Sequence, residues 1–197
     1  MQALAKPAGL ISVEEYLEGE RASDVRHELV DGRVYAMAGA SDDHNRIAGN
    51  LFAELRERLR GGRCEPFIHD MKVKIPPTFA DVFYYPDVMV VCDPTDQAKY
   101  FRERPAVLCE VISPDTERTD RREKAIAYRQ IATVEAYVLV EQDRIAVTVL
   151  RRGEPGWQSE TLEGPGAVLK LPSLGVEIPL ERLYERTGAA GTSRPVA

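Results

Sequence analysis

The chain has 197 residues, of which 44% are hydrophobic and 29% are charged. This composition is that of an ordinary globular protein, and it excludes a disordered, collagen-like or disulfide-framework protein. The 26 Lys and Arg residues against 32 Asp and Glu residues give a net charge of −6. Overall charge therefore does not make the molecule a general binder of DNA or of anionic membranes, and a nucleic-acid function has to depend on a local site.

The first part of the chain predicts a helix, a hairpin and a second helix. The capping-box pattern of residues 12–15 predicts a short helix that ends near residue 19. Asp31 and Gly32 lie between two alternating runs, which predicts a hairpin. Ser41 is expected to cap a longer helix that lays one apolar face on a sheet. Its apolar residues recur every four positions, at Ile47, Leu51, Leu55 and Leu59.

The rest of the chain predicts a mixed sheet flanked by helices. Strands are expected at residues 64–75, 82–93, 106–113, 136–140, 144–152, 157–162 and 168–171, with a tight turn at Gln142-Asp143. A helix capped by Asp115 or Thr116 is expected to reach about Ile131, and another to span residues 180–186. This order predicts a single α/β domain over residues 1–186 and a flexible tail over residues 187–197.

The N-terminal stretch lacks the apolar core of a secretory signal, and no apolar run approaches the roughly 18 residues of a membrane span. The three cysteines, Cys64, Cys92 and Cys109, are an odd number and form no C-x-x-C motif. Such cysteines are expected to be reduced core residues. Together these features predict a cytoplasmic protein without a membrane anchor.

Glu110 is the most informative residue, because the run AVLCEVIS surrounds one carboxylate with apolar side chains. Burying an ionised carboxylate is costly unless it is paired or bound to a metal. Two alternatives stay open for Glu110. It can lie on an edge strand and face water, or it can form a purely structural ion pair.

Asp87 stands at the start of the apolar run VMVV, directly after Pro86. If this run and the strand of Glu110 are neighbours, the two carboxylates can share a hard cation such as Mg²⁺. A metal of this kind lowers the pKa of its bound water and offsets charge on a phosphate. The alternative for Asp87 is ordinary turn chemistry before a strand.

Lys124 lies in the charged helix that follows Ser113 and Pro114. Ile126 and Ile131 are expected to rest this helix on the sheet, so that Lys124 reaches the carboxylates and orients water or neutralises a phosphoryl oxygen. The alternative is a solvated, charged helix face. Helical spacing places Asp120, Arg121 and Tyr128 on the face of Lys124.

Several motifs occur in one order: RHELVDGRVYAMAGASDDHNRIAGNL, YPDV, CEVIS followed by Pro114, TDRREKAIAY and SLGVEIPLERLY. In this order they resemble the Uma-two family of the PD-(D/E)XK restriction-endonuclease-like superfamily. The resemblance covers residues 13–184. It implies a restriction endonuclease-like fold and a hydrolase, a metal-dependent endonuclease that cleaves DNA phosphodiester bonds.

Carried over position by position, the resemblance implies roles for four residues. Asp87 and Glu110 would be the metal-binding acidic residues of the PD and (D/E)XK elements, and Glu28 an additional acidic residue that approaches the metal. The lysine expected two residues after Glu110 is absent, because Ile112 occupies that position. Lys124 is therefore expected to take the role of this lysine. The implied cofactor is Mg²⁺ or Mn²⁺.

The histidines are weaker candidates. His44 lies near the start of the long helix, where the family pattern points it toward the site and a packing or surface role is the alternative. His27 and His69 show no clear partner in the sequence and are interpreted as structural. The absence of two histidines at metal-ligand spacing argues against a zinc site.

Two functions of different classes follow. The first is a Mg²⁺- or Mn²⁺-dependent endodeoxyribonuclease with weak, salt-sensitive and local contact to DNA; a homodimer would suit cleavage of both strands. The second is a non-catalytic binding or interaction protein with a nuclease fold, in which the carboxylates form an ion pair with Lys124. Acyl-transfer chemistry has little support, because G-x-S-x-G is absent. Basic residues gather before and after the strand of Glu110, at Arg102, Arg104, Arg118, Arg121, Arg122 and Arg129.

Overall fold

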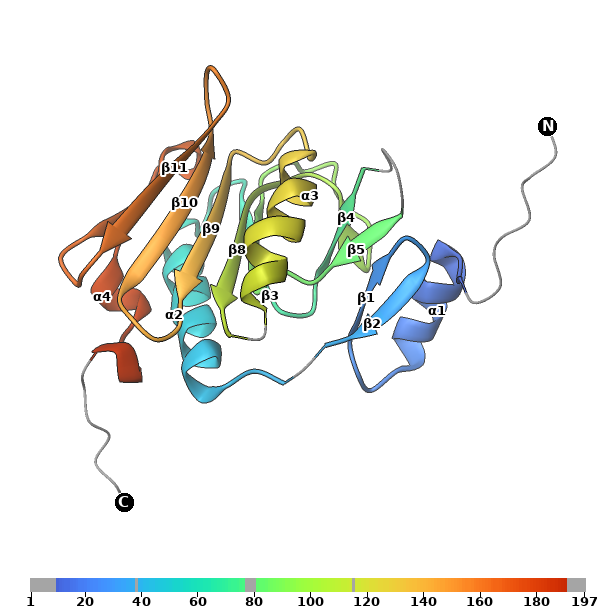
Figure 1. Ribbon diagram of the computed structural model, residues 1–197. Helices are drawn as coiled ribbons and strands as arrows, with labels where there is room; N and C mark the ends of the chain where they lie inside the picture. The colour runs from blue at the N-terminus through green and yellow to red at the C-terminus, as the bar shows by residue number, and fades with distance from the viewer. Residues whose placement is uncertain (1–9, 38, 77–80, 115, 191–197) are drawn as a thin grey trace.

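The computed structural model describes residues 10–37, 39–76, 81–114 and 116–190. Two sheets form the centre of the molecule, and Figure 1 shows α2 behind the larger sheet and α3 in front of it, with α1 beside the smaller sheet. The helices are α1 (Val13–Ala22), α2 (Asp42–Arg58), a π-helix (Thr119–Lys124) that continues into α3 (Ala125–Arg129), and α4 (Leu180–Leu183). Short 3-10 turns span Pro172–Leu174 and Gly188–Ala190.

The larger sheet has six strands in the order β11-β10-β9-β8-β6-β3. Strands β8 and β9 run parallel, and the other neighbours are antiparallel. The strands are β3 (Glu65–Ile68), β6 (Val88–Val91), β8 (Pro105–Ile112), β9 (Ala136–Glu141), β10 (Ala146–Arg152) and β11 (Trp157–Glu163). This arrangement is a mixed α/β fold, as the sequence predicts.

Both faces of this sheet are covered, and alternation along β8 decides which residue meets which layer. Val107, Cys109 and Val111 pack in the core cluster that contains the apolar stripe of α2. Leu108 and Ile112 pack in the opposite cluster, with residues of α3. Glu110 lies between these two along the strand, so its side chain points to the α3 side.

The smaller sheet has five strands in the order β2-β1-β5-β4-β7. They are β1 (His27–Val30), β2 (Arg33–Ala36), β4 (Lys72–Ile75), β5 (Val82–Tyr84) and β7 (Phe101–Arg102). Helix α1 covers it through a small cluster of Tyr16, Leu29 and Phe83. A separate hairpin pairs β12 (Val168–Leu171) with β13 (Val176–Pro179).

Local signals place the helix starts and the first hairpin correctly. Ser12 and Glu15 form the predicted capping box, and α1 runs three residues beyond its predicted end at Gly19. The Ser41 hydroxyl caps α2 by accepting from the backbone N–H of His44. Asp31 and Gly32 both have positive φ angles and form the turn between β1 and β2.

Several predicted strands are interrupted. The single strand expected over residues 64–75 is two strands, β3 and β4, in different sheets, because the chain reverses at His69 with φ of 55°. The run over residues 82–93 likewise divides into β5 and β6 on either side of Pro86 and Asp87. At each of these two breaks the chain passes from one sheet to the other.

The prediction of reduced core cysteines is wrong for two of the three. Cys64 and Cys92 form a disulfide, whereas Cys109 is free and buried. The cause is the pairing of β3 with β6, in which Glu65 lies opposite Val91, so Cys64 and Cys92 are the next opposing pair. The prediction of a cytoplasmic location loses the support that reduced cysteines gave it.

The helix after Ser113 differs from its prediction in geometry. Its first part is a π-helix, and Ile126 is 63% exposed instead of resting on the sheet, while Ile131 is buried as expected. Of the two predicted caps, Asp115 lies outside the described residues. Thr116 accepts the backbone N–H of Asp120 through its carbonyl oxygen.

Packed structure continues past residue 186. The Thr187 side chain is buried, and Ala189 contacts the main core. Residues 191–197 of the predicted tail lie outside the described residues. Within the described part of the chain, no helix has the length and apolar character needed to cross a membrane.

Candidate active site

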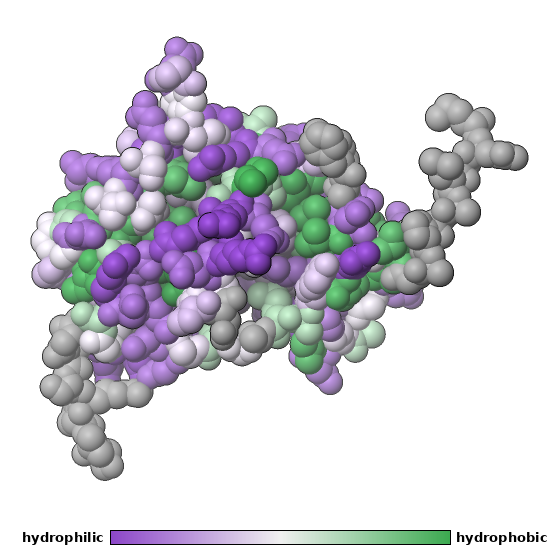
Figure 2. Space-filling model, viewed as in Figure 1, coloured by the Kyte–Doolittle hydropathy of each residue, from purple (hydrophilic) through white to green (hydrophobic). Residues whose placement is uncertain are grey.

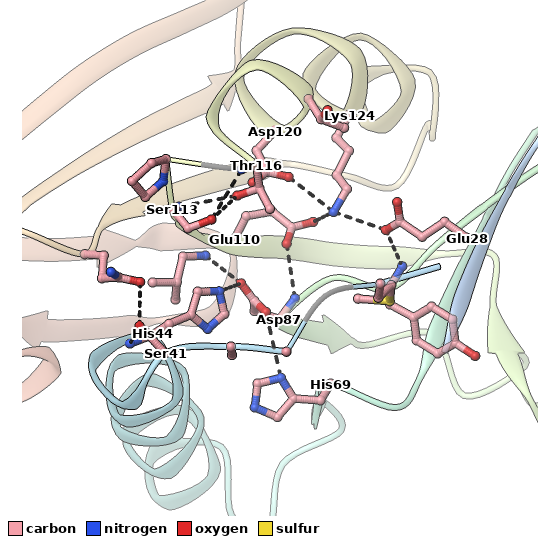
Figure 3. A pocket seen from close by; sticks show the side chains of 18 of the residues that line it. Glu28, Ser41, His44, His69, Asp87, Glu110, Ser113, Thr116, Asp120 and Lys124 are labelled. Atoms are coloured by element: carbon pink, nitrogen blue, oxygen red, sulfur yellow. Dashed lines mark hydrogen bonds and ion pairs between the residues drawn. The ribbon is translucent and has the colours of Figure 1, made fainter. Parts of the chain in front are cut away.

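A cavity of about 720 Å³ opens where the two sheets, the π-helix and the start of α2 meet. Its lining includes all four residues that the resemblance singles out, namely Glu28, Asp87, Glu110 and Lys124. Figure 3 shows their side chains converging from separate elements of the fold. The structure thus brings the predicted residues together, although they are far apart in the sequence.

Asp87 and Glu110 occupy opposing positions of two neighbouring chain segments. Val88 of β6 pairs with Cys109 of β8 in antiparallel register, so the preceding residue, Asp87, lies opposite Glu110. The backbone N–H of Asp87 donates to Glu110 Oε2 at 3.3 Å. The backbone N–H of Val111 donates to Asp87 Oδ2 at 2.7 Å. Backbone atoms of the rigid sheet therefore hold both carboxylates in place.

Lys124 reaches this pair from the π-helix. Its Nζ lies 3.1 Å from Glu110 Oε1, 3.2 Å from Glu28 Oε1 and 3.2 Å from Asp120 Oδ1 (Figure 3). Burial alone would lower the pKa of Lys124, but the charges of Glu110, Glu28 and Asp120 outweigh it and raise that pKa well above its ordinary value. The ammonium therefore stays charged and bridges three carboxylates.

Glu110 is 3% exposed, which excludes the alternative of a water-facing edge residue. Burial raises the pKa of its carboxyl well above the ordinary value, an effect that the charge of Lys124 opposes. The Tyr128 hydroxyl donates to Glu110 Oε1 at 2.8 Å and also favours the ionised form. Glu110 is consequently a carboxylate whose negative charge requires a nearby cation.

Glu28 connects this centre to the smaller sheet. It lies on β1, and its Oε1 accepts the backbone N–H of Tyr85 at 3.3 Å as well as contacting Lys124. Tyr85 immediately precedes the Pro86-Asp87 turn. Glu28 is therefore more than an exposed hairpin residue, because it ties the hairpin to the segment that carries Asp87.

Two histidines lie beside Asp87. His44 Nε2 is 3.1 Å from Asp87 Oδ2, and His69 Nδ1 is 3.8 Å from Asp87 Oδ1. Burial would lower the pKa of His44, but its bond to Asp87 and the charges of Asp87 and Asp120 raise it overall. The expectation that His27 and His69 lack partners is wrong for both, since His69 lies beside Asp87 and also lines the cavity. His27 contacts Glu20 instead, at 2.7 Å, and lies outside the cavity lining.

Sequence reasoning leaves Asp120 and Tyr128 out of the proposed site, although helical spacing places both on the face of Lys124. Asp120 is 2% exposed and pairs with Lys124, and Tyr128 is fully buried against Glu110. The spacing is the available signal for both residues. Nothing local in the sequence indicates His69, because its position depends on the chain reversal between β3 and β4.

The donor set suits a hard divalent cation. Carboxylate oxygens are the ligands that Mg²⁺ and Mn²⁺ prefer, and Asp87, Glu110 and Glu28 supply them around one cavity. Asp87 Oδ1 lies 3.8 Å from His69 Nδ1, which is beyond hydrogen-bond length. Among the described residues, no three His, Cys, Asp or Glu side chains are assembled around one metal position. The chemistry of the residues fits a cation, and Lys124 supplies the positive charge in this structure.

The exposed side of the helical segment above the cavity is strongly hydrophilic (Figure 2). Its exposed residues include Arg118, Arg122, Glu123 and Arg129. Arg121 forms ion pairs with Glu117 and Glu141, so its positive charge is already compensated within the protein. The basic residues near the site therefore form a local, mixed patch within an acidic molecule.

Comparisons with known proteins agree with this geometry. A family model named Uma2, described as "Putative restriction endonuclease", matches residues 13–181. An uncharacterized protein of Synechocystis sp. is 32% identical to this chain, and the match covers 90% of this chain and 93% of that protein. A second uncharacterized protein of Synechocystis sp. is 28% identical, and the match covers 82% of this chain and 92% of that protein. A crystal structure from Anabaena variabilis, described as a "putative nuclease belonging to DUF820", superposes with a TM-score of 0.67 at 19% identity. It covers 82% of this chain and 91% of that one, which shows a shared fold. The chain belongs to the Uma2 family of restriction endonuclease-like proteins.

Proposed function

We propose that the protein is an endonuclease that hydrolyses phosphodiester bonds of DNA with the help of Mg²⁺ or Mn²⁺. One observation carries this proposal: Asp87, directly before β6, lies opposite Glu110 of β8, the buried ammonium of Lys124 contacts Glu110, and all three residues line one cavity. Membership of a restriction endonuclease family supports the same conclusion.

Asp87 and Glu110 are the residues that would hold the divalent ion, and Glu28 stands at the edge of the same set. When bound, such an ion supplies a water molecule of lowered pKa and neutralises charge on the phosphate. The sheet contributes preorganisation, because backbone N–H groups fix Asp87 and Glu110 before substrate arrives.

Lys124 is the group that stabilises negative charge building up on the phosphate or orients the attacking water. Asp120 and Tyr128 act as positioning residues, since Asp120 holds the ammonium and Tyr128 holds the carboxylate that faces it. His44 holds Asp87 from the side of α2. Each contact fixes a side chain whose misplacement would weaken catalysis.

Nicking of supercoiled plasmid, with Mg²⁺ and separately with Mn²⁺, tests the proposal. The wild-type protein is expected to nick the plasmid, and Asp87→Asn and Glu110→Gln to abolish nicking. Glu160→Gln is the matched control, because Glu160 is an exposed carboxylate on β11 outside the cavity lining. Nicking that survives both Asp87→Asn and Glu110→Gln would overturn the assignment.

The second candidate is a non-catalytic protein with the same fold. It is favoured by the three contacts of Lys124, which neutralise the carboxylates without a metal. Calorimetric titration with Mn²⁺ separates the two functions. A working nuclease site binds Mn²⁺ and loses it in the Asp87→Asn protein, whereas a purely structural ion pair shows no binding in either protein.

Two finer points stay predictions. A cytoplasmic location is one, and a homodimer is the other, since a two-fold dimer would present two cavities to the two strands of a duplex. Sedimentation velocity of the purified protein measures the oligomeric state directly.

A further inference from the structure

Strand β2 forms one outer edge of the five-stranded sheet, and all four of its residues are exposed. An open edge that also carries apolar side chains is unusual, because proteins normally protect such edges. Tyr35 is 51% exposed and Met37, which follows the strand, is 36% exposed. Both residues line the same cavity as Asp87 and Glu110.

Register fixes which side of the hairpin these residues occupy. Tyr35 is the direct partner of Glu28 across β1 and β2, so the two side chains share one face. Residues two positions apart along a strand also share a face, which places Arg33 and Met37 on the side of Tyr35. The strand therefore presents a cation, an aromatic ring and a thioether in a row that leads toward the carboxylates, with about 6.6 Å between successive members.

Among the residues that the structure describes, Tyr35 makes no ring-to-ring or cation-to-ring contact. Tyr100 gives a contrast, because it is 38% exposed and carries both Arg21 and Lys99 over its ring. The indole of Trp157 is similarly covered, by Arg129 and Arg152. Tyr35 thus offers a free aromatic face beside the site.

We propose that Tyr35 stacks on an unpaired nucleobase next to the scissile phosphate, with Met37 packing beside that base and Arg33 contacting the following phosphate. This inference rests on the proposed function and names its substrate class: DNA that is single-stranded or locally unpaired at the cleavage position. Every nucleobase has a π face that an aromatic ring can stack on. In an intact duplex both faces are covered by neighbouring base pairs, so the ring selects unpaired bases.

Binding of a single-stranded oligodeoxynucleotide that contains 2-aminopurine tests the inference, with EDTA present so that cleavage does not interfere. Fluorescence reports stacking of the modified base, and anisotropy of an end label reports affinity. Stacking on one aromatic side chain contributes enough that Tyr35→Ala is expected to weaken single-strand binding by about 5- to 150-fold. Tyr35→Phe keeps the ring and is expected to bind like wild type.

Tyr100→Ala is the matched control, because it removes an exposed tyrosine outside the cavity lining and is expected to change neither signal. Binding of the corresponding duplex is expected to be the same for wild type and Tyr35→Ala. The inference is overturned if Tyr35→Ala binds single strands like wild type, or if it loses duplex and single-strand binding equally. A change of oligomeric state in Tyr35→Ala, measured by sedimentation, would also overturn it by making β2 an interface between copies of the chain.

Failure of this inference and failure of the proposed function give different results. If plasmid nicking requires Asp87 and Glu110 while Tyr35→Ala has no effect on single-strand binding, the nuclease function is supported and the stacking role of Tyr35 is excluded. If no DNA is cleaved under any condition but Tyr35→Ala loses single-strand binding, the strand is a binding surface on a non-catalytic protein.

Discussion

The two sheets of this protein contribute different kinds of residues to the cavity that they share. The larger sheet is covered on both faces, and all eight residues of β8 are buried. The smaller sheet ends in β2, whose four residues are all exposed. The larger sheet supplies Asp87 and Glu110, which need exact placement, whereas the smaller sheet supplies an accessible edge.

The interiors of the two sheets also differ. On one side of the larger sheet, the buried core around α2 is aliphatic apart from Cys109 and Tyr184, and the partly buried Phe52 packs against it. The smaller sheet contains a buried polar chain, in which the Tyr85 hydroxyl accepts from Lys72 Nζ at 2.9 Å and donates to Glu20 Oε2 at 2.6 Å. The larger sheet therefore holds its part of the site mainly through apolar packing, and the smaller sheet adds a directional polar network beside an exposed edge strand.

Lys124→Met gives the sharpest test of this division. Removing one member of a buried charge cluster leaves the carboxylates uncompensated, so the free energy of unfolding is expected to fall by about 3–5 kcal/mol in the absence of divalent ions. Urea denaturation measures this loss. Adding Mg²⁺ is expected to recover part of it, because a cation that binds the folded state stabilises that state.

Lys170→Met serves as the control, because Lys170 and its partner Glu177 are both largely exposed, and the pair contributes about 0–1 kcal/mol. A loss for Lys124→Met as small as that of the control would show that the buried cluster does not depend on its ammonium.

Apolar truncations compare the two halves directly. Leu51→Ala, in the fully buried face of α2, is expected to cost about 2–5 kcal/mol of unfolding free energy. Val34→Ala, in exposed β2, is expected to stay within about 0.5 kcal/mol of wild type. Thermal and urea denaturation of both variants measure the difference. Equal losses would mean that β2 is packed in solution and that its edge is not free.

The smallest effect concerns a carboxylate at the other end of β6. Hydrogen bonds from the Thr95 hydroxyl and backbone, and then from Arg104, lower the pKa of Asp93 to about 2, from an ordinary value of 3.8. Burial drives the pKa of Glu110 in the opposite direction. The ionised Asp93 therefore stabilises the folded state above pH 3.8, and this contribution is lost as the pH falls toward 2.

An NMR titration of the Asp93 carboxyl carbon checks this expectation, with a midpoint near 2 in the wild type. Arg104→Ala removes one of the donors and is expected to raise that midpoint. A midpoint near 3.8 in the wild-type protein would contradict the hydrogen-bonded turn.

Sequence alone predicts those elements that local signals specify. The capping box at Ser12, the turn at Asp31-Gly32 and the periodic apolar face of α2 each depend on residues within one or two turns of chain. Glu110 was recognisable for the same reason, since a carboxylate inside an apolar run is anomalous by itself.

The remaining features depend on contacts between distant segments. The disulfide of Cys64 with Cys92 follows from the register of β3 against β6, and local sequence signals do not predict that register. The proximity of His69 to Asp87 follows from the left-handed backbone at His69, where no glycine marks the reversal. Ile126 is exposed because α3 turns Lys124 and Tyr128 inward, and a residue two positions from each lies about 200° away around an α-helix.

That π-helix makes the site sensitive to the length of the chain as well as to its composition. In a π-helix each N–H bonds five residues back instead of four, so the segment holds an extra residue compared with an α-helix. Deleting one exposed residue, such as Glu123, would leave Asp120 three residues before Lys124 instead of four and would change the turn through which the two side chains meet. Substitutions on this helix change single contacts, whereas a deletion changes the backbone that carries Asp120 and Lys124 together.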